Sequence, residues 1–159
     1  MFPLLLTVVP LFALAQPAAS AQPARAIQIL LKQEFGRALF SECRLDVVVN
    51  GGGGRASAYC VRNVFKEPPY ELQYERALTL EEANRLLVLA RGSNLLSGSS
   101  IGADPTASDG IFETLKVTEA GQTAVLVTSG NPSFMMGIRR NLLEFLHTLS
   151  NELLKNAKR

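Results

Sequence analysis

The chain has 159 residues, a formal net charge of +2 and no tryptophan. This small surplus of positive charge gives no support for binding to nucleic acid or to an anionic membrane surface. Aromatic residues make up 7% of the chain, too few to predict stacking platforms for sugars or bases.

The N-terminal segment carries no charged side chain up to Ala21 and is largely apolar from Leu4 to Ala15. An apolar run of this length is too short to span a bilayer, which needs about 20 residues, but it is typical of a secretory signal peptide. Ala19-Ser20-Ala21 has the small-x-small pattern of a cleavage site. We therefore expect residues 1–21 to be a signal peptide. The alternative is a buried N-terminal helix or strand.

Residues 22–159 have a size typical of one domain with one hydrophobic core. They contain no second long apolar segment, so we expect no stable insertion into a membrane after cleavage. A signal peptide also predicts a periplasmic or extracellular location, where disulfides persist.

The first apolar segment of this domain, Ile27–Gln33, fits two patterns. Alternation of Ile27, Ile29 and Leu31 with polar residues favours a strand, whereas a stripe that continues to Phe35 fits a helix. We interpret the segment as a strand and leave the helix as the alternative.

A β-hairpin is predicted where Cys43–Asn50 and Arg55–Arg62 alternate on either side of four glycines. If Gly51-Gly52 is a two-residue loop, Cys43 and Cys60 face each other at a non-hydrogen-bonded pair, with Cα atoms about 4.5 Å apart. An even number of cysteines in an exported chain also favours a disulfide between them. A hairpin shifted by two residues, or two buried free thiols, would contradict this pairing.

The glycine run also resembles a phosphate-binding loop, because Gly51, Gly53 and Ala56 follow a strand with G-x-G-x-x-A spacing. Such a loop works only where a helix begins next, so that backbone amides meet the phosphates. Residues 56–61 are strand-like instead. The hairpin is therefore the better interpretation.

A third alternating run, Tyr70–Arg76, predicts another strand, and a helix follows it. Thr79 and Glu82 have the spacing of a capping box, in which each side chain bonds the backbone amide of the other residue. We expect this helix to end at Gly92, with glycine in the left-handed conformation.

The second half of the chain begins with a long loop over residues 93–110, rich in Gly, Ser and Asp. A hairpin of Ile111–Thr118 and Thr123–Ser129 follows, turning at Glu119–Gln122, and a helix over Gly137–Lys155 closes the chain. The apolar stripe expected on that helix is Ile138, Leu142, Phe145, Leu149 and Leu153, flanked by Leu146. Strands that succeed one another without crossover helices predict an α+β class: a mostly antiparallel sheet of five to six strands with two helices packed on one face.

Catalytic and metal-binding patterns are weak throughout. His147 is the only histidine, and one histidine with two bonded cysteines cannot build a zinc site. Ser150 lies one turn further along, but nothing in the sequence orients the pair, so we interpret His147 as an exposed helix residue whose replacement by alanine changes stability by about 0.5 kcal/mol at most. Asp104 and Asp109 lack the alternating ligands of a calcium loop. We predict no catalytic residue, no metal site and no cofactor, and hence no enzyme.

Two segments are candidates for an interaction surface. The long loop contains Leu95, Leu96 and Ile101, and a Gly-Asn-Pro turn precedes Phe134, Met135 and Met136. Methionine and phenylalanine beside a turn can form an adaptable contact patch. Residues 134–136 fit equally the entry of the last helix, where apolar side chains pack inward as core.

The order of elements resembles that of exported bacterial domains of uncharacterised function. The residues that carry this resemblance are Phe40-Ser41-Glu42-Cys43, the turn at Gly51–Gly54, and Leu78-Thr79-Leu80-Glu81-Glu82. This chain has a glycine run where those domains commonly have an Asp-Gly turn, and it has no proline after Cys43. The second half, from Leu78 to Leu149, is similar to emfourin-type inhibitors of bacterial metallopeptidases, which also close with a leucine-rich helix. Neither resemblance assigns a functional residue.

Taken together, the sequence predicts a non-catalytic exported domain that binds another exported protein, as an inhibitor or an envelope component. The alternative is a domain that binds a small ligand or a polysaccharide in a groove between sheet and helices. A hydrolase with an unrecognised site is the third hypothesis.

Overall fold

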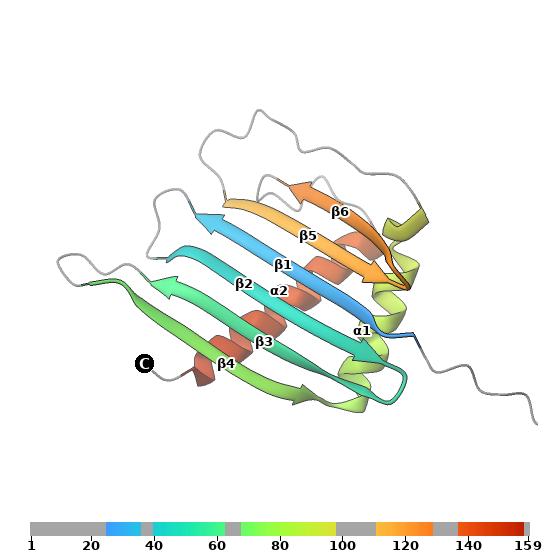
Figure 1. The fold of residues 1–159 in the computed structure, drawn as a ribbon, viewed down its shortest axis with the longest axis horizontal. Helices are drawn as coiled ribbons and strands as arrows, with labels where there is room; N and C mark the ends of the chain where they lie inside the picture. Colours follow the sequence, from blue (N-terminus) through green and yellow to red (C-terminus); the bar gives the residue numbers. More distant parts are fainter. Residues whose placement is uncertain (1–24, 36–39, 63–67, 98–110, 129–136, 158–159) are drawn as a thin grey trace, which may run out of the picture.

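The computed structural model describes residues 25–35, 40–62, 68–97, 111–128 and 137–157. Six strands form one antiparallel sheet in the order β4-β3-β2-β1-β5-β6, and both helices, α1 and α2, lie on one face of it (Figure 1). The α+β prediction is confirmed. The strands are β1 (Ile27–Phe35), β2 (Phe40–Asn50), β3 (Gly53–Arg62), β4 (Tyr70–Leu78), β5 (Ile111–Glu119) and β6 (Gln122–Thr128); the helices are α1 (Leu80–Gly92), the short 3-10 helix η1 (Leu95–Ser97) and α2 (Ile138–Asn156).

The ambiguous first segment is a strand. β1 lies in the middle of the sheet, between β2 and β5, and its residues Ile27, Ile29 and Leu31 are buried. Their alternation with more exposed residues matches the period of two that a half-buried strand requires. The helical interpretation is therefore wrong, because Ile27, Ile29 and Leu31 pack on the buried face of the sheet.

The first hairpin has the predicted register. Gly51-Gly52 forms the loop, Asn50 pairs with Gly53, and Cys43 pairs with Cys60. The two cysteines form a disulfide with their Cα atoms 4.1 Å apart. A Cβ atom at Gly54 would lie 2.6 Å from the carbonyl oxygen of Val48, so this position accepts only glycine without a shift of the strands.

Helix α1 begins as predicted and ends differently. Thr79 Oγ1 accepts from the Glu82 amide, and Glu82 Oε2 accepts from the Thr79 amide, which completes the capping box. Gly92, however, is the last helical residue and does not adopt the left-handed conformation. Ser93 caps the helix, and Asn94 takes the positive φ of 53° instead. Asparagine tolerates this conformation, so the chain reverses two residues later than expected.

The second hairpin turns where predicted, through Ala120 and Gly121, both with positive φ; Glu119 and Gln122 form the last pair of the two strands. Two central residues with positive φ match the twist of the adjoining strands.

Helix α2 spans the predicted residues, but its buried face is rotated relative to the expected stripe. Ile138 is 45% exposed and Phe145 is only partly buried, while Leu143 and Ser150 are buried. The reason is that α2 contacts both the sheet and α1, so its apolar surface is divided between two neighbours. The buried residues of α2 are Leu142, Leu143, Leu146, Leu149, Ser150 and Leu153.

The hydrophobic core fills the space between the sheet and the two helices. The opposite face of the sheet is solvent-facing and carries charged pairs such as Arg44 with Asp46 and Arg55 with Glu75. Among the residues that the structure describes, no helix is long and apolar enough to cross a membrane.

Candidate functional site

The outer side of α1, away from the core, carries a second apolar strip. Leu80 is 59% exposed and Val88 is 70% exposed, the two largest values for a big apolar side chain in the described part of the chain. Leu80 and Val88 are eight positions apart, so they lie on the same side of the helix, about 12 Å apart along its axis. A shallow hollow of about 600 Å³ adjoins them and is lined by Leu80, Glu81, Asn84, Arg85, Val88 and Leu89. We call these six residues the α1 ridge.

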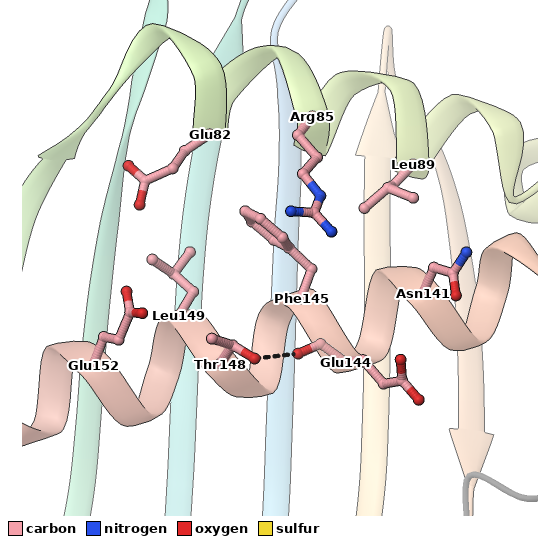
Figure 2. Close-up of a pocket in the computed structure, with 9 residues that line it drawn as sticks. All are labelled: Glu82, Arg85, Leu89, Asn141, Glu144, Phe145, Thr148, Leu149 and Glu152. Atoms are coloured by element: carbon pink, nitrogen blue, oxygen red, sulfur yellow. Dashed lines mark hydrogen bonds between the residues drawn. The ribbon is translucent and has the colours of Figure 1, made fainter.

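A groove of about 440 Å³ runs between the outer sides of α1 and α2 (Figure 2). Phe145 stands between the helices, and the Arg85 guanidinium lies 5.0 Å from the centre of its ring. Glu82, Glu144 and Glu152 also line the groove. The groove is therefore polar at its rim and aromatic in its middle.

The carboxylates of this groove are compensated by neighbouring cations. Arg76 binds Glu82 in a two-pronged contact of 2.6 and 2.8 Å and lies 3.8 Å from Glu152. Arg140 binds Glu144 at 2.7 Å. Each of the three carboxylates thus has an arginine within 4 Å. The space between sheet and helices, where a ligand groove was the alternative, is occupied by the core.

A polar cluster lies inside the domain where β1, β5, β6 and α2 meet. Glu113 of β5 is only 4% exposed. Its carboxylate accepts hydrogen bonds from Gln33 Nε2 at 2.6 Å and from Thr128 Oγ1 at 3.5 Å. His147 Nε2 lies 2.8 Å from Glu113 Oε1, close enough for an ion pair when the imidazole is protonated, although this contact lacks the geometry of a hydrogen bond.

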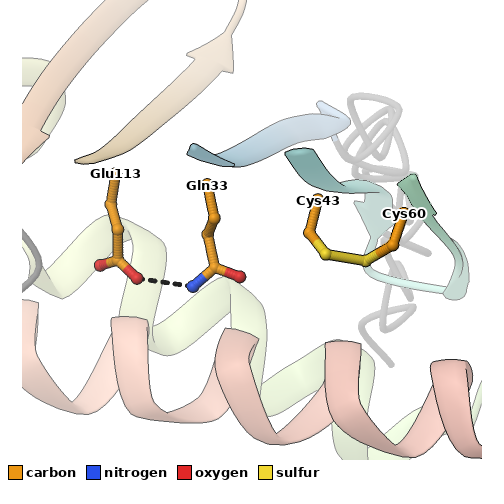
Figure 3. The surroundings of a disulfide bond; sticks show 4 residues. All are labelled: Gln33, Cys43, Cys60 and Glu113. Atoms are coloured by element: carbon orange, nitrogen blue, oxygen red, sulfur yellow. Dashed lines mark hydrogen bonds between the residues drawn. A yellow bond between two sulfur atoms is a disulfide. The ribbon is translucent and has the colours of Figure 1, made fainter. Parts of the chain in front are cut away.

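Figure 3 shows that Glu113 and Gln33 of this cluster lie in one row across the sheet with the disulfide. Gln33 pairs with Cys43 on one side and with Glu113 on the other, and Cys43 pairs with Cys60. All these side chains point towards α2. The disulfide thus adjoins the buried carboxylate through Gln33.

The pKa of Glu113 reflects opposing influences. Burial raises the pKa, because a charged carboxylate loses its hydration inside the domain. The contacts with His147, Gln33 and Thr128 stabilise the carboxylate and outweigh burial, so the net pKa lies below its ordinary value. Glu113 is therefore held in its charged form by its partners.

The interpretation of His147 as an exposed helix residue is wrong. Its side chain is 28% exposed and faces Glu113, because the buried face of α2 is rotated towards Leu143 and Ser150, which flank His147. The sequence does contain a pattern that points to this site. In the alternating strand Ile111–Glu119, Glu113 occupies a position of the buried face, where an unpaired carboxylate is costly and a cationic partner is expected.

The described contacts of this cluster place one buried carboxylate among polar side chains. Ser150 is buried on the same helix, but no hydrogen bond links it to His147 within the described residues. In the same part of the chain, no group of three His, Cys, Asp or Glu side chains is arranged to hold a metal ion. The contacts of Glu113 with Gln33, Thr128 and His147 join β1, β5, β6 and α2.

The predicted contact residues of the long loop are placed differently from the expectation. Leu95, in η1, is 4% exposed and belongs to the core, and Leu96 packs against that core. Leu95 is therefore not a surface residue, because η1 lies against β5 and β6, whereas Leu96 is only partly buried. Ile101, Asp104, Asp109, Phe134, Met135, Met136 and the expected signal peptide lie outside the described residues.

No protein-family model matches this chain, and no curated protein matches it. The resemblances to exported bacterial domains and to emfourin-type inhibitors stay predictions.

Proposed function

We propose that this chain is a non-catalytic, exported protein-binding domain and that the α1 ridge is its contact surface. The observation that carries the proposal is the exposure of Leu80 and Val88 on one side of a helix whose other side is already buried in the core. We infer that these two anchors, with the apolar part of the hollow beside them, form the contact surface, since apolar side chains exposed together on one side are found where a partner binds.

The ridge is held rigidly, which favours its use in recognition. The capping box fixes the start of α1, and Arg76 ties Glu82 to the end of β4. At the other end of the helix, Arg91 binds Glu119 at 2.8 Å. A preorganised surface loses little conformational entropy when a partner binds.

The chemistry of the ridge indicates the kind of partner. Leu80 and Val88 would insert into an apolar groove about 12 Å long, and covering each side chain contributes on the order of 1–2 kcal/mol. Glu81 and Arg85 beside them offer one charge of each sign at the rim. We therefore propose a protein partner with an apolar groove and a mixed-charge rim, such as an exported enzyme or an envelope protein.

The compartment is part of this proposal. The disulfide between Cys43 and Cys60 supports an oxidising environment, and the pattern of residues 1–21 supports export.

Affinity capture with matched variants tests the contact surface. The purified wild-type domain is incubated with exported proteins of its native host, alongside the variants Val88→Gln and Val48→Gln. Val48 is 42% exposed on the open face of the sheet and serves as the control, because the chemical change is the same and the surface differs. We expect one discrete partner to be retained by wild type and by Val48→Gln and lost with Val88→Gln. Retention by all three, or capture of no discrete partner, would contradict the proposal.

A further inference from the structure

The two edges of the sheet are protected to different degrees. β4 carries Glu71 and Glu75 on its exposed positions and follows Pro68-Pro69, and both charge and proline discourage edge-to-edge pairing. β6, the other edge strand, has the sequence QTAVLVT, with no charged residue and no proline. Among the described elements, no strand lies outside β6.

The register of the β5–β6 hairpin fixes which backbone groups of β6 point outwards. Glu119 and Gln122 flank the two-residue turn and form a hydrogen-bonded pair, and such pairs alternate along an antiparallel ladder. Gln122, Ala124, Leu126 and Thr128 therefore bond β5. The amide and carbonyl groups of the residues between them point away from the sheet; these residues are Thr123, Val125 and Val127.

This outward set is self-complementary. A two-fold axis at Val125 in an antiparallel pair places Val125 opposite Val125 of a second copy and Thr123 opposite Val127. These pairs all lie at hydrogen-bonded positions. The three amide and three carbonyl groups that point outwards from each β6 strand would therefore all form hydrogen bonds. No charge opposes a like charge across this pair, since β6 has none.

We propose that β6 is a homodimerisation edge, which pairs antiparallel with β6 of a second copy around Val125 and joins the two sheets into one. Val125 is 40% exposed on the open face, where two β-branched side chains would meet directly across the axis. We choose a second copy as the partner because its β6 always has the same uncharged sequence, whereas a strand of a different protein need not be free of charge. The edge is distinct from the α1 ridge, so the two proposals fail independently.

The substitution Val125→Lys tests this pairing. It places two lysines opposite each other at the axis, and like charges at opposed positions destabilise a strand pair. The control is Val48→Lys, which introduces the same residue at a similar exposure, 42%, in the interior strand β2. By sedimentation velocity over a concentration series, we expect wild type and Val48→Lys to dimerise, and Val125→Lys to dissociate with a Kd at least about tenfold higher.

Charge complementation and amide exchange locate the contact at β6. An equimolar mixture of Val125→Lys and Val125→Glu should form a tighter dimer than either variant forms alone. The amides of Thr123, Val125 and Val127 should exchange more slowly as wild type is concentrated. If wild type is monomeric at the highest soluble concentration, the proposal is wrong. This holds whether these amides exchange fast or exchange slowly because other residues of the same chain protect them. An equal loss of dimer in Val48→Lys, or no loss in Val125→Lys, also overturns it.

Discussion

Glu113 of β5 and His147 of α2 meet inside the domain, with Oε1 and Nε2 2.8 Å apart. The two residues are far apart in sequence, and their contact joins the closing helix to β5, the strand next to the edge strand β6. Gln33 completes the link to the disulfide strand through its pairing with Cys43.

Replacing His147 should therefore cost stability. His147→Ala removes the imidazole that lies 2.8 Å from the buried Glu113 carboxylate, and we expect the free energy of unfolding to fall by about 1–3 kcal/mol at neutral pH. Urea denaturation measures the loss. Thr148→Ala, which changes an exposed neighbour on the same helix, is the control. A loss of less than about 0.5 kcal/mol in His147→Ala would show that Gln33 and Thr128 suffice for Glu113.

Because of Glu113, the free energy of unfolding should fall at low pH. Its folded pKa lies below the ordinary value of 4.5, so the carboxylate contributes stability fully above that value. The contribution is lost as the pH falls through the folded pKa, because the unfolded chain then binds the proton first. Denaturation curves from pH 7 downwards should show this loss in wild type and a smaller one in Glu113→Gln. Parallel pH profiles of the two proteins would refute the assignment.

Glu82 should make a second acid-dependent contribution. Its bond with Arg76 is the largest cause that lowers its pKa from 4.5 to about 2, and the contacts with Thr79 add to it. After allowance for solvent screening, we expect Glu82→Gln to cost about 1–2 kcal/mol at pH 7. The difference from wild type should shrink between pH 4.5 and about 2. Glu81→Gln, on the exposed side of the same turn, should have a much smaller effect; equal effects would mean that the Arg76 contact contributes little.

Reduction of the Cys43–Cys60 disulfide should lower stability without unfolding the domain. The cysteines are separated by 17 positions, for which chain entropy gives about 3 kcal/mol. The true loss is expected to be smaller, because the hairpin keeps its two strands close in residual structure. Differential scanning calorimetry of oxidised and reduced protein should show a melting temperature several degrees lower after reduction. Free thiols in the native exported protein would contradict the bond.

The proposed signal peptide has a direct test. Cleavage after Ala21 leaves Gln22 as the N-terminal residue, either free or cyclised. Intact mass spectrometry of protein recovered from its native host should give this terminus. Protein that retains Met1 or Phe2 would remove the argument for export.

The first hairpin and the start of α1 could be predicted from the sequence, because each depends on contacts between residues that are close along the chain. The two-residue loop at Gly51-Gly52 and the pair Cys43–Cys60 define one register, because a hairpin has no freedom once its turn is known. Thr79 and Glu82 likewise cap α1 through contacts within one turn.

Features that depend on distant neighbours were not predictable in the same way. The buried face of α2 is set by both α1 and the sheet, so Phe145 faces the groove between helices and His147 turns towards Glu113. Leu95 belongs to the core because η1 folds back against β5 and β6, a contact that the composition of the loop does not indicate. The α1 ridge was missed because the spacing of Leu80 from Ala83 and Leu87 is that of one apolar helical stripe, yet Leu80 is exposed while the other two are buried.

The most direct test of the α1 ridge as a protein-binding surface is photo-crosslinking in the native host. A photoreactive phenylalanine analogue replaces Val88 in the full chain, and in a separate strain it replaces Val48. We predict one discrete adduct with a different exported protein from position 88 and no such adduct from position 48. No adduct from position 88, or the same adducts from both positions, would contradict the account.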